Sequence, residues 1–360
     1  MNTLARAEHL AVAAARFPFL GHSTAEDFLA LIRAELGHAE ILDDFQRRDA
    51  HFAKAVAPAV ILHIISGNTP AAGLQSVIRG LLLGSHNFCK IPSVGLPEIA
   101  AFRDALPSAL AERVEISAEQ PGEWLDRADA VIVFGSDETI AYFRARTQVG
   151  QTFIAHGHRL SAGFVFDDPR FESVVGAARD VAAFDQQGCL SPQAIYVRSD
   201  AGGYAERLAV EMEKRDALDP RGAISLSESL AIRSTREDIA FRAANGEEVQ
   251  IWQSAGSTAW TVAFDATPGF PHSPLNRFVF VKPLPADLAR ELATVRAHLS
   301  TAGIQPAMLE HARTLGALGF SRVCPLGAMQ SPPWTWLQDG ALSLGALIRW
   351  VGFEGESSDG

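Results

Sequence analysis

The chain has few cysteines, no basic cluster and no long apolar run, and each absence excludes a class of protein. No stretch reaches the roughly 18 uninterrupted apolar residues of a membrane-spanning helix. The net charge is -11 and Lys and Arg nowhere form a run, so we expect no nucleic-acid-binding face. Three widely spaced cysteines cannot form a disulfide framework and lack metal-ligand spacing, which predicts a metal-free protein of the reducing cytosol.

Several catalytic signatures are also absent. The sequence contains no GxGxxG fingerprint, no GxxxxGK(S/T) loop, no HExxH helix and no GxSxG elbow. These absences make a P-loop NTPase, a zincin, an α/β-hydrolase and an ordinary Rossmann dehydrogenase poor fits. Arg16 and Pro18 interrupt the Ala-rich N-terminus and no clean cleavage site follows, so we expect an amphipathic helix rather than a signal peptide.

What is present is the composition of an ordinary globular protein, with 48% hydrophobic and 20% charged residues. Residues 1–56 are predicted to be mostly helical, with a capping box at Ser23–Glu26 opening a helix to Leu36. Short apolar strands then alternate with helices, which predicts a parallel, doubly wound α/β sheet. The expected strands are 60–65, 87–91, 130–134, 152–155 and 163–166, and the expected helices are 71–83, 94–106, 137–146 and 171–183.

The second half repeats this alternation more loosely, and a proline-rich tail follows with a short last helix to about Trp350. The expected strands here are 194–197, 248–252, 259–264 and 278–281, and the expected helices are 201–215, 224–232, 285–298 and 306–315.

Cys189 lies on a tight loop, FDQQGCLSPQAIYV, directly before an apolar strand. Such a loop lets substrate approach while the strand fixes the backbone, as a nucleophile requires. A cysteine is also often a small buried hydrophobe, and this segment alone favours neither interpretation. Cys89 lies within a predicted strand and Cys324 in the tail, and neither follows a glycine on a loop.

A second motif is the turn Ser66-Gly67-Asn68-Thr69-Pro70 between a buried strand and a helix. Ligands of open α/β sheets bind at the carboxyl ends of strands, where helix N-termini attract phosphates. The Asn68 amide can donate to a developing oxyanion, an interaction worth roughly 3 kcal/mol in a well-built site. A plain loop-and-cap role is the alternative, because Asn and Gly favour turns and Thr-Pro suits a helix start.

Two further strand ends carry polar groups. Lys90 ends a strand, Ser93 opens the next helix and no acid occurs before Glu98, a pattern that favours NADP over NAD. A surface lysine without a ligand is the alternative. Gly135-Ser136 is a third phosphate-compatible turn, but the acidic residues after it would repel a phosphate, and plain helix capping explains it as well.

The segments SGNTP, CKIPS, FGSDE, AHGHRLSAGFVFDD, FDQQGCLSPQ and RVCPLGAMQSPPW occur in one order. Together they resemble the acyl-CoA reductase family typified by the reductase component of the bacterial luminescence fatty-acid reductase. That family is a divergent branch of the aldehyde dehydrogenase superfamily, and the resemblance covers roughly residues 55–350. It implies an aldehyde dehydrogenase-like fold of two doubly wound α/β domains with the active site between them. The implied parts are N-terminal helices with an NAD(P)-binding domain over 1–186, a catalytic domain over 187–325, and a segment 326–360 that packs back on the enzyme or a partner subunit.

The resemblance also implies residue roles, with Cys189 as the nucleophile and Asn68 as the oxyanion donor. Hydrolytic relatives carry a glutamate base in a LELGGK-like segment, whereas the matching IAHGHR has Ala155 at that position. Without this base water is not readily activated against an acyl-enzyme, as a CoA-dependent reductase requires. His158 or His156 can assist the thiolate, and we select His158, although a plain loop histidine is the simpler interpretation. The implied cofactor-binding residues are Ser66, Gly67, Thr69, Lys90, Ser93, Gly135 and Ser136.

The function implied is the NADPH-dependent reduction of an acyl thioester to the aldehyde through an acyl-cysteine. The substrate would be an acyl-CoA or an acyl-carrier protein, with CoA as leaving group. The resemblance also implies a cytoplasmic homo-oligomer, with a complex with an acyl-activating partner as a further option. Two alternatives stay open: a cysteine acyltransferase or thioesterase without nicotinamide, and a non-catalytic scaffold.

Overall fold

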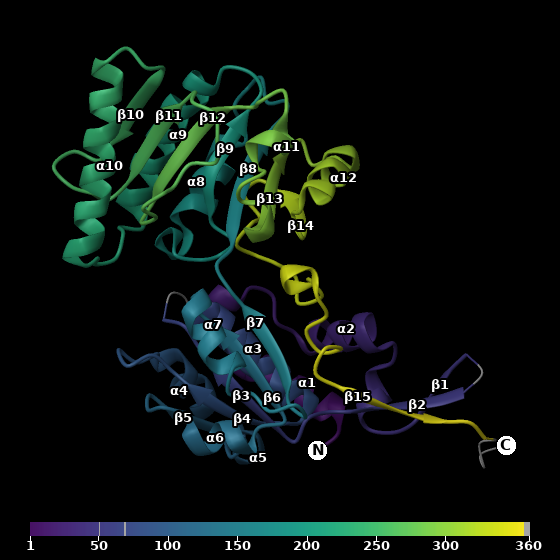
Figure 1. Cartoon of the computed structure of the whole chain (residues 1–360). Helices are drawn as coiled ribbons and strands as arrows, with labels where there is room; N and C mark the ends of the chain where they lie inside the picture. The colour runs from purple at the N-terminus through teal and green to yellow at the C-terminus, as the bar shows by residue number, and fades with distance from the viewer. Residues whose placement is uncertain (50, 68–69, 356–360) are drawn as a thin grey trace. The chain divides into compact units, whose positions relative to one another are not determined.

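The structure is a computed structural model that describes residues 1–49, 51–67 and 70–355. It divides into two compact units, Met1–His158 with Pro333–Gly360, and Arg159–Pro332 (Figure 1). The division differs from the expected boundary at 186/187, because the strand that starts at Leu160 pairs into the second sheet. The C-terminal segment from Pro333 belongs to the first unit.

The first unit is built on a five-stranded parallel sheet of order β5-β4-β3-β6-β7. Strands β4 and β5 lie on one side of β3, and β6 and β7 lie on the other side. The direction in which successive strands are added therefore reverses between β3 and β6. This is the parallel, doubly wound arrangement predicted from the alternation of strands and helices. The strands are β3 (Val60–Ile64), β4 (His86–Lys90), β5 (Val114–Ser117), β6 (Ala130–Phe134) and β7 (Thr152–His156).

Among the described residues this unit has seven α-helices: α1 and α2 precede the sheet in the sequence, and α3 to α7 connect its strands. Helix α3 is buried along most of its length, because it packs between the sheet and the N-terminal helices. The capping box of α2 is confirmed one residue later than expected, since Thr24 and Asp27 make its two hydrogen bonds. The helices are α1 (Thr3–Ala14), α2 (Ala25–Leu36), α3 (Pro70–Leu83), α4 (Pro97–Asp104), α5 (Ser108–Ala111), α6 (Gly122–Arg127) and α7 (Asp137–Arg144).

Two helical predictions at the ends of the chain are wrong. Strands β1 (Gln46–Arg48) and β2 (His51–Val56) occupy the end of the region predicted as helical, and β15 (Arg349–Phe353) replaces the expected last helix. The three strands form one antiparallel sheet. In β2, Ala53 and Ala55 are buried while their neighbours are more exposed, a two-residue period that suits a strand.

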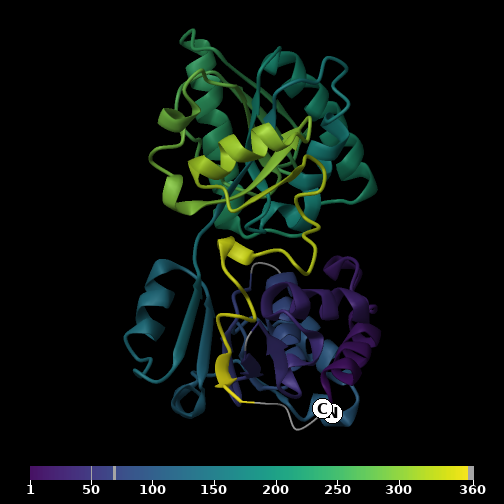
Figure 2. The ribbon, with the colours of Figure 1, turned by 90° about the vertical axis from the view of Figure 1, so that its right-hand side faces the viewer.

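The C-terminal segment also crosses the first unit. The Asp339 carboxylate bonds to His156 on β7, and the Ser343 hydroxyl donates to Glu35 on α2. This segment, yellow in Figure 2, therefore joins the N-terminal helices to one edge of the sheet.

The second unit contains a seven-stranded sheet of order β10-β11-β12-β9-β8-β13-β14, parallel except for β10. Its strands are β8 (Leu160–Val165), β9 (Pro192–Val197), β10 (Val249–Gln253), β11 (Thr261–Asp265), β12 (Phe278–Pro283), β13 (Leu299–Gln305) and β14 (Arg322–Pro325). Its helices are α8 (Val174–Ala182), α9 (Ala201–Leu218), α10 (Leu226–Ala244), α11 (Leu288–Glu291) and α12 (Leu309–Leu318).

Strand β13 is the largest correction in this unit. The helix expected over 285–298 is wrong, because only Leu288–Glu291 is α-helical, and β13 follows it between β8 and β14. The strand is almost wholly buried, yet its sequence LSTAGIQ is rich in small polar residues and gives no strong apolar signal. Gly303 is required there, since a Cβ atom would lie 2.6 Å from the Met329 sulfur.

No helix in the described part of the chain combines the length and the apolar character needed to cross a membrane.

Candidate active site

The predicted cofactor-binding residues of the first unit follow three adjacent parallel strands. Ile64 of β3 pairs with Lys90 of β4 on one side and with Val133 of β6 on the other, so the carboxyl ends of these strands lie at one edge. A Cβ atom on Gly67 would lie 3.2 Å from Pro92 Cγ, so the turns after β3 and β4 touch. Asn68 and Thr69 lie outside the described residues.

The residues at this edge differ in their exposure to solvent. Ser66 and Lys90 are half-buried, whereas Gly67, Ser93 and Ser136 are exposed. Lys90 is the last residue of β4, the position from which dinucleotide sites contact the adenosine ribose. A cation rather than an acid at this position suits a 2′-phosphate, so the residues present fit NADPH.

The third turn shows the capping role that was the alternative for it. The Ser136 hydroxyl accepts a hydrogen bond from Thr139 N at 3.4 Å and caps α7. A Cβ atom on Gly135 would lie 3.0 Å from Thr139 Cβ, so a glycine is needed for this close packing. In this turn, Gly135 therefore allows the backbone to approach Thr139 closely, while the Ser136 side chain caps α7.

Cys189 is exposed, and its loop lies between a short 3₁₀ helix, Ala183–Gln186, and β9. The Ser161 hydroxyl donates to the Cys189 carbonyl at 2.7 Å, and Ser191 N donates to the Gly188 carbonyl at 3.0 Å. The Gln330 amide donates to the Ser191 hydroxyl at 3.1 Å. The backbone around the thiol is therefore held by bonds to two other segments of the second unit.

The residues just before Cys189 have a strained backbone. Phe184, Asp185 and Gln186 all have positive φ, between 51° and 64°, a region that costs a non-glycine residue free energy. The buried Gln186 side chain holds this conformation: its amide donates to the carbonyls of Pro192 and Phe278, and its oxygen accepts from Phe278 N at 2.7 Å. Asp185 forms an ion pair with Arg277 at 2.7 Å. Strain of this kind clusters at functional sites.

The other two cysteines are poor nucleophiles. Cys89 is fully buried in β4, and burial raises its pKa well above the ordinary value. Burial also raises the pKa of Cys324, in β14, to about 11. Among the three cysteines, Cys189 is the exposed one.

The structure distinguishes the two candidate histidines. His158 is exposed. His156 lies at the end of β7 with its Nδ1 2.8 Å from Asp339 Oδ2, and the two side chains are only 17% and 11% exposed. Its ring stacks on Phe134 with centroids 4.6 Å apart. A carboxylate at Nδ1 orients the ring and leaves Nε2 as the basic nitrogen.

Asp339 was not found by the sequence interpretation. It lies 183 residues from His156 in the chain, within a short turn, and nothing local marks it as a partner. The described residues contain no group of three or more His, Cys, Asp or Glu side chains that could hold a metal ion.

Comparisons with known proteins agree with this architecture. A sequence model of the family described as acyl-CoA reductase (LuxC) matches residues 2–350. The long-chain acyl-protein thioester reductase of Aliivibrio fischeri is 24% identical over 348 residues, covering 90% of this chain and 70% of the relative. The long-chain acyl-protein thioester reductase 2 of Photobacterium leiognathi is 22% identical over 353 residues, covering 91% and 71%.

Solved structures show the fold. Methylmalonate-semialdehyde dehydrogenase from Oceanimonas doudoroffii superposes with a TM-score of 0.68 at 14% identity, over 99% of this chain and 86% of that one. The predicted aldehyde dehydrogenase-like fold is therefore confirmed.

Proposed function

Because the chain belongs to the acyl-CoA reductase (LuxC) family, we propose that it reduces an acyl thioester to the aldehyde with NADPH, through an acyl group bound covalently to Cys189. The observation that carries the covalent step is the exposure of Cys189 on a strained, anchored loop, while burial raises the pKa of the other two thiols. The curated relatives named above are reductases of acyl-protein thioesters, which supports a thioester as substrate.

In the proposed reaction the Cys189 sulfur attacks the thioester carbonyl carbon. The bond from that carbon to the leaving thiol then breaks, and CoA or a carrier-protein thiol departs. The Cys189 N–H and the Asn68 amide stabilise the oxyanion of the tetrahedral intermediate. Splitting the reaction at an acyl-enzyme replaces one difficult step by two easier ones.

NADPH, when bound, supplies the hydride that reduces the acyl group, and Lys90, Ser93 and the turns at Gly67 and Gly135 would hold it. After reduction the thiohemiacetal carbon–sulfur bond breaks, which releases the aldehyde and returns the Cys189 thiolate. The protein's part in this step is to orient the acyl group and to keep water from it.

Ala155 and His156, at the end of β7, have different roles in the proposed reaction. Ala155 provides no carboxylate to activate water, so the acyl-enzyme persists until it is reduced. We assign the proton-transfer role to His156 instead of His158, because Asp339 and Phe134 fix the orientation of the His156 ring. His156 would act as the general base of the proposed reaction.

Mass spectrometry of the enzyme mixed with acyl-CoA in the absence of NADPH tests the proposal. We expect one acyl adduct, on the peptide that contains Cys189, and its disappearance when NADPH is added. Cys189→Ala should lose the adduct and lower turnover at least about a thousandfold, whereas the matched variant Cys324→Ala should keep both. Reduction by Cys189→Ala, or turnover to free acid without NADPH in the wild-type protein, would refute the scheme.

A further inference from the structure

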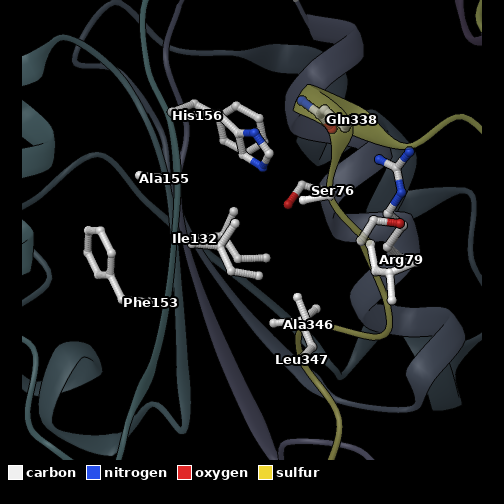
Figure 3. A pocket seen from close by; sticks show the side chains of 14 residues that line it. Ser76, Arg79, Ile132, Phe153, Ala155, His156, Gln338, Ala346 and Leu347 are labelled. Carbon is white, nitrogen blue, oxygen red and sulfur yellow. The ribbon is translucent and has the colours of Figure 1, made fainter. Parts of the chain in front are cut away.

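The first unit contains a cavity of about 270 Å³ at the carboxyl end of its sheet (Figure 3). Helix α3, strands β6 and β7 and the C-terminal segment line it. Its walls are mostly apolar, and a few polar side chains come from different elements, as in ligand-binding pockets. The apolar side chains include Ile132, Phe134, Ile154, Leu342, Ala346 and Leu347.

Arg79 of α3 is the cationic side chain of this cavity and is only 5% exposed. Its guanidinium lies over the ring of Trp334, 5.4 Å from the ring centroid. Among the described residues no group accepts a hydrogen bond from its Nε atom. Burial lowers the pKa of Arg79 to about 10. A buried cation whose donors lack acceptors is costly, which indicates that a further group belongs beside it.

The charge of Glu35 acts on Arg79, although no hydrogen bond joins these two side chains among the described contacts. Glu35 raises the Arg79 pKa through its charge, which opposes the larger effect of burial. Its carboxylate oxygens are occupied elsewhere: Oε1 accepts from the Ser343 hydroxyl at 2.7 Å, and Oε2 accepts from Leu344 N at 2.7 Å and Gly345 N at 2.9 Å. Among the described residues, the Arg79 Nε donor is therefore left without an acceptor.

Ser76, one turn before Arg79 on α3, cannot serve as a second donor. The Asn87 amide donates to the Ser85 carbonyl, which turns its oxygen towards His63 Nε2 at 2.9 Å. His63 Nε2 therefore carries the proton, and its Nδ1 accepts the proton of the Ser76 hydroxyl at 2.8 Å. Ser76 thus presents only lone pairs to the cavity.

These groups define the ligand. The Arg79 cation faces an apolar cavity. Glu35 and Asp339 already bring negative charge to this region. A singly charged anion therefore suits the cavity better than a doubly charged phosphate. We propose that the cavity binds the carboxylate of a small apolar acid, with Arg79 donating to the carboxylate and the apolar walls covering the hydrocarbon body. The acid is a free fatty acid.

Calorimetric titration of octanoate tests the proposal without using activity. We expect octanoate to bind the wild-type protein and the inactive Cys189→Ala variant alike, and methyl octanoate to bind more weakly to both. Arg79→Met should weaken octanoate binding about tenfold or more, the usual effect of losing a charge-assisted hydrogen bond. Arg103→Met, which removes a half-buried arginine of α4 paired with Asp104, should keep the affinity.

Thermal unfolding of the same variants separates binding from folding. Arg79→Met should melt at the same or a higher temperature than the wild type, because methionine replaces a desolvated cation, and octanoate should raise the melting temperature of the wild type alone. If Arg79→Met does not fold, Arg79→Lys takes its place, with weaker binding expected because lysine lacks the planar fork. Equal octanoate affinity in the folded Arg79 variant and the wild type, or no binding to the wild type, would overturn the proposal.

Discussion

Acidification should destabilise the first unit through His63. This histidine lies in β3 with 0% exposure and bridges Ser76 and Asn87, and burial lowers its pKa to about 4. The folded state therefore keeps His63 neutral, while the unfolded chain takes up a proton below about pH 6.5. The contribution of the neutral His63 to the free energy of unfolding is fully present above about pH 6.5 and is lost as the pH falls towards about 4.

The magnitude follows from the two pKa values. A difference of about 2.5 units corresponds to about 3 kcal/mol once both states are protonated, and to about 2 kcal/mol at pH 5. That is a large share of the 5–15 kcal/mol that typically stabilises a folded protein. Protonation would also turn Nδ1 into a donor, so the Ser76 hydroxyl would have to rotate its own proton away and accept the hydrogen bond from His63 instead.

Urea unfolding at pH 7, 6 and 5 measures this effect, with pulsed hydrogen exchange of β3 and β4 as the readout for the first unit alone. His63→Gln should be less stable at pH 7 but should lose about 2 kcal/mol less than the wild type between pH 7 and pH 5. His86→Gln, an exposed histidine of the same sheet, should follow the wild type. Parallel losses in the wild type and His63→Gln would refute the assignment of the pH dependence to His63.

Two further predictions concern the proposed chemistry. Ala155→Glu should create a general base and raise the rate of NADPH-independent thiol release about a hundredfold, as measured with a thiol reagent. The matched variant Ala155→Gln should not raise this rate. Equal rates in both variants would contradict the role given to Ala155. Lys90→Ala should raise the KM for NADPH about tenfold while leaving the KM for NADH and for the thioester unchanged, because only the contact with the 2′-phosphate is lost. Equal changes in the KM values for NADPH and NADH in a steady-state assay would show that Lys90 does not contact this phosphate.

The alternation of apolar strands and helices in the first half was enough to predict its sheet. Strands such as Val60–Ile64 and Ala130–Phe134 are buried on both faces, and their continuous apolar runs are visible in the sequence. Their strand-end turns could be identified for the same reason, since a turn must follow where each run stops. The loop position of Cys189 was equally readable, because its glycine, serine and proline neighbours are local signals.

Other elements left no such pattern. Strand β13 carries Ser300, Thr301 and Gly303 at buried positions, because its neighbours leave space only for small side chains, and a sequence without a strong apolar period does not mark a strand. Strand β15 depends on pairing with β2, nearly 300 residues earlier. Pairing over such a distance is decided by tertiary contacts.

By itself, the sequence determined the fold class and the family, and it placed Cys189 on a loop, because these depend on local patterns of apolar residues, turns and short motifs. Only the tertiary structure decided that His156 has a carboxylate partner, since His156 and Asp339 meet through the folding of the C-terminal segment back onto β7. It also decided that Arg79, an ordinary helical arginine in the sequence, is buried beside an apolar cavity with a donor that no described residue satisfies. Burial and hydrogen bonding are properties of the packed chain, and no local pattern encodes them.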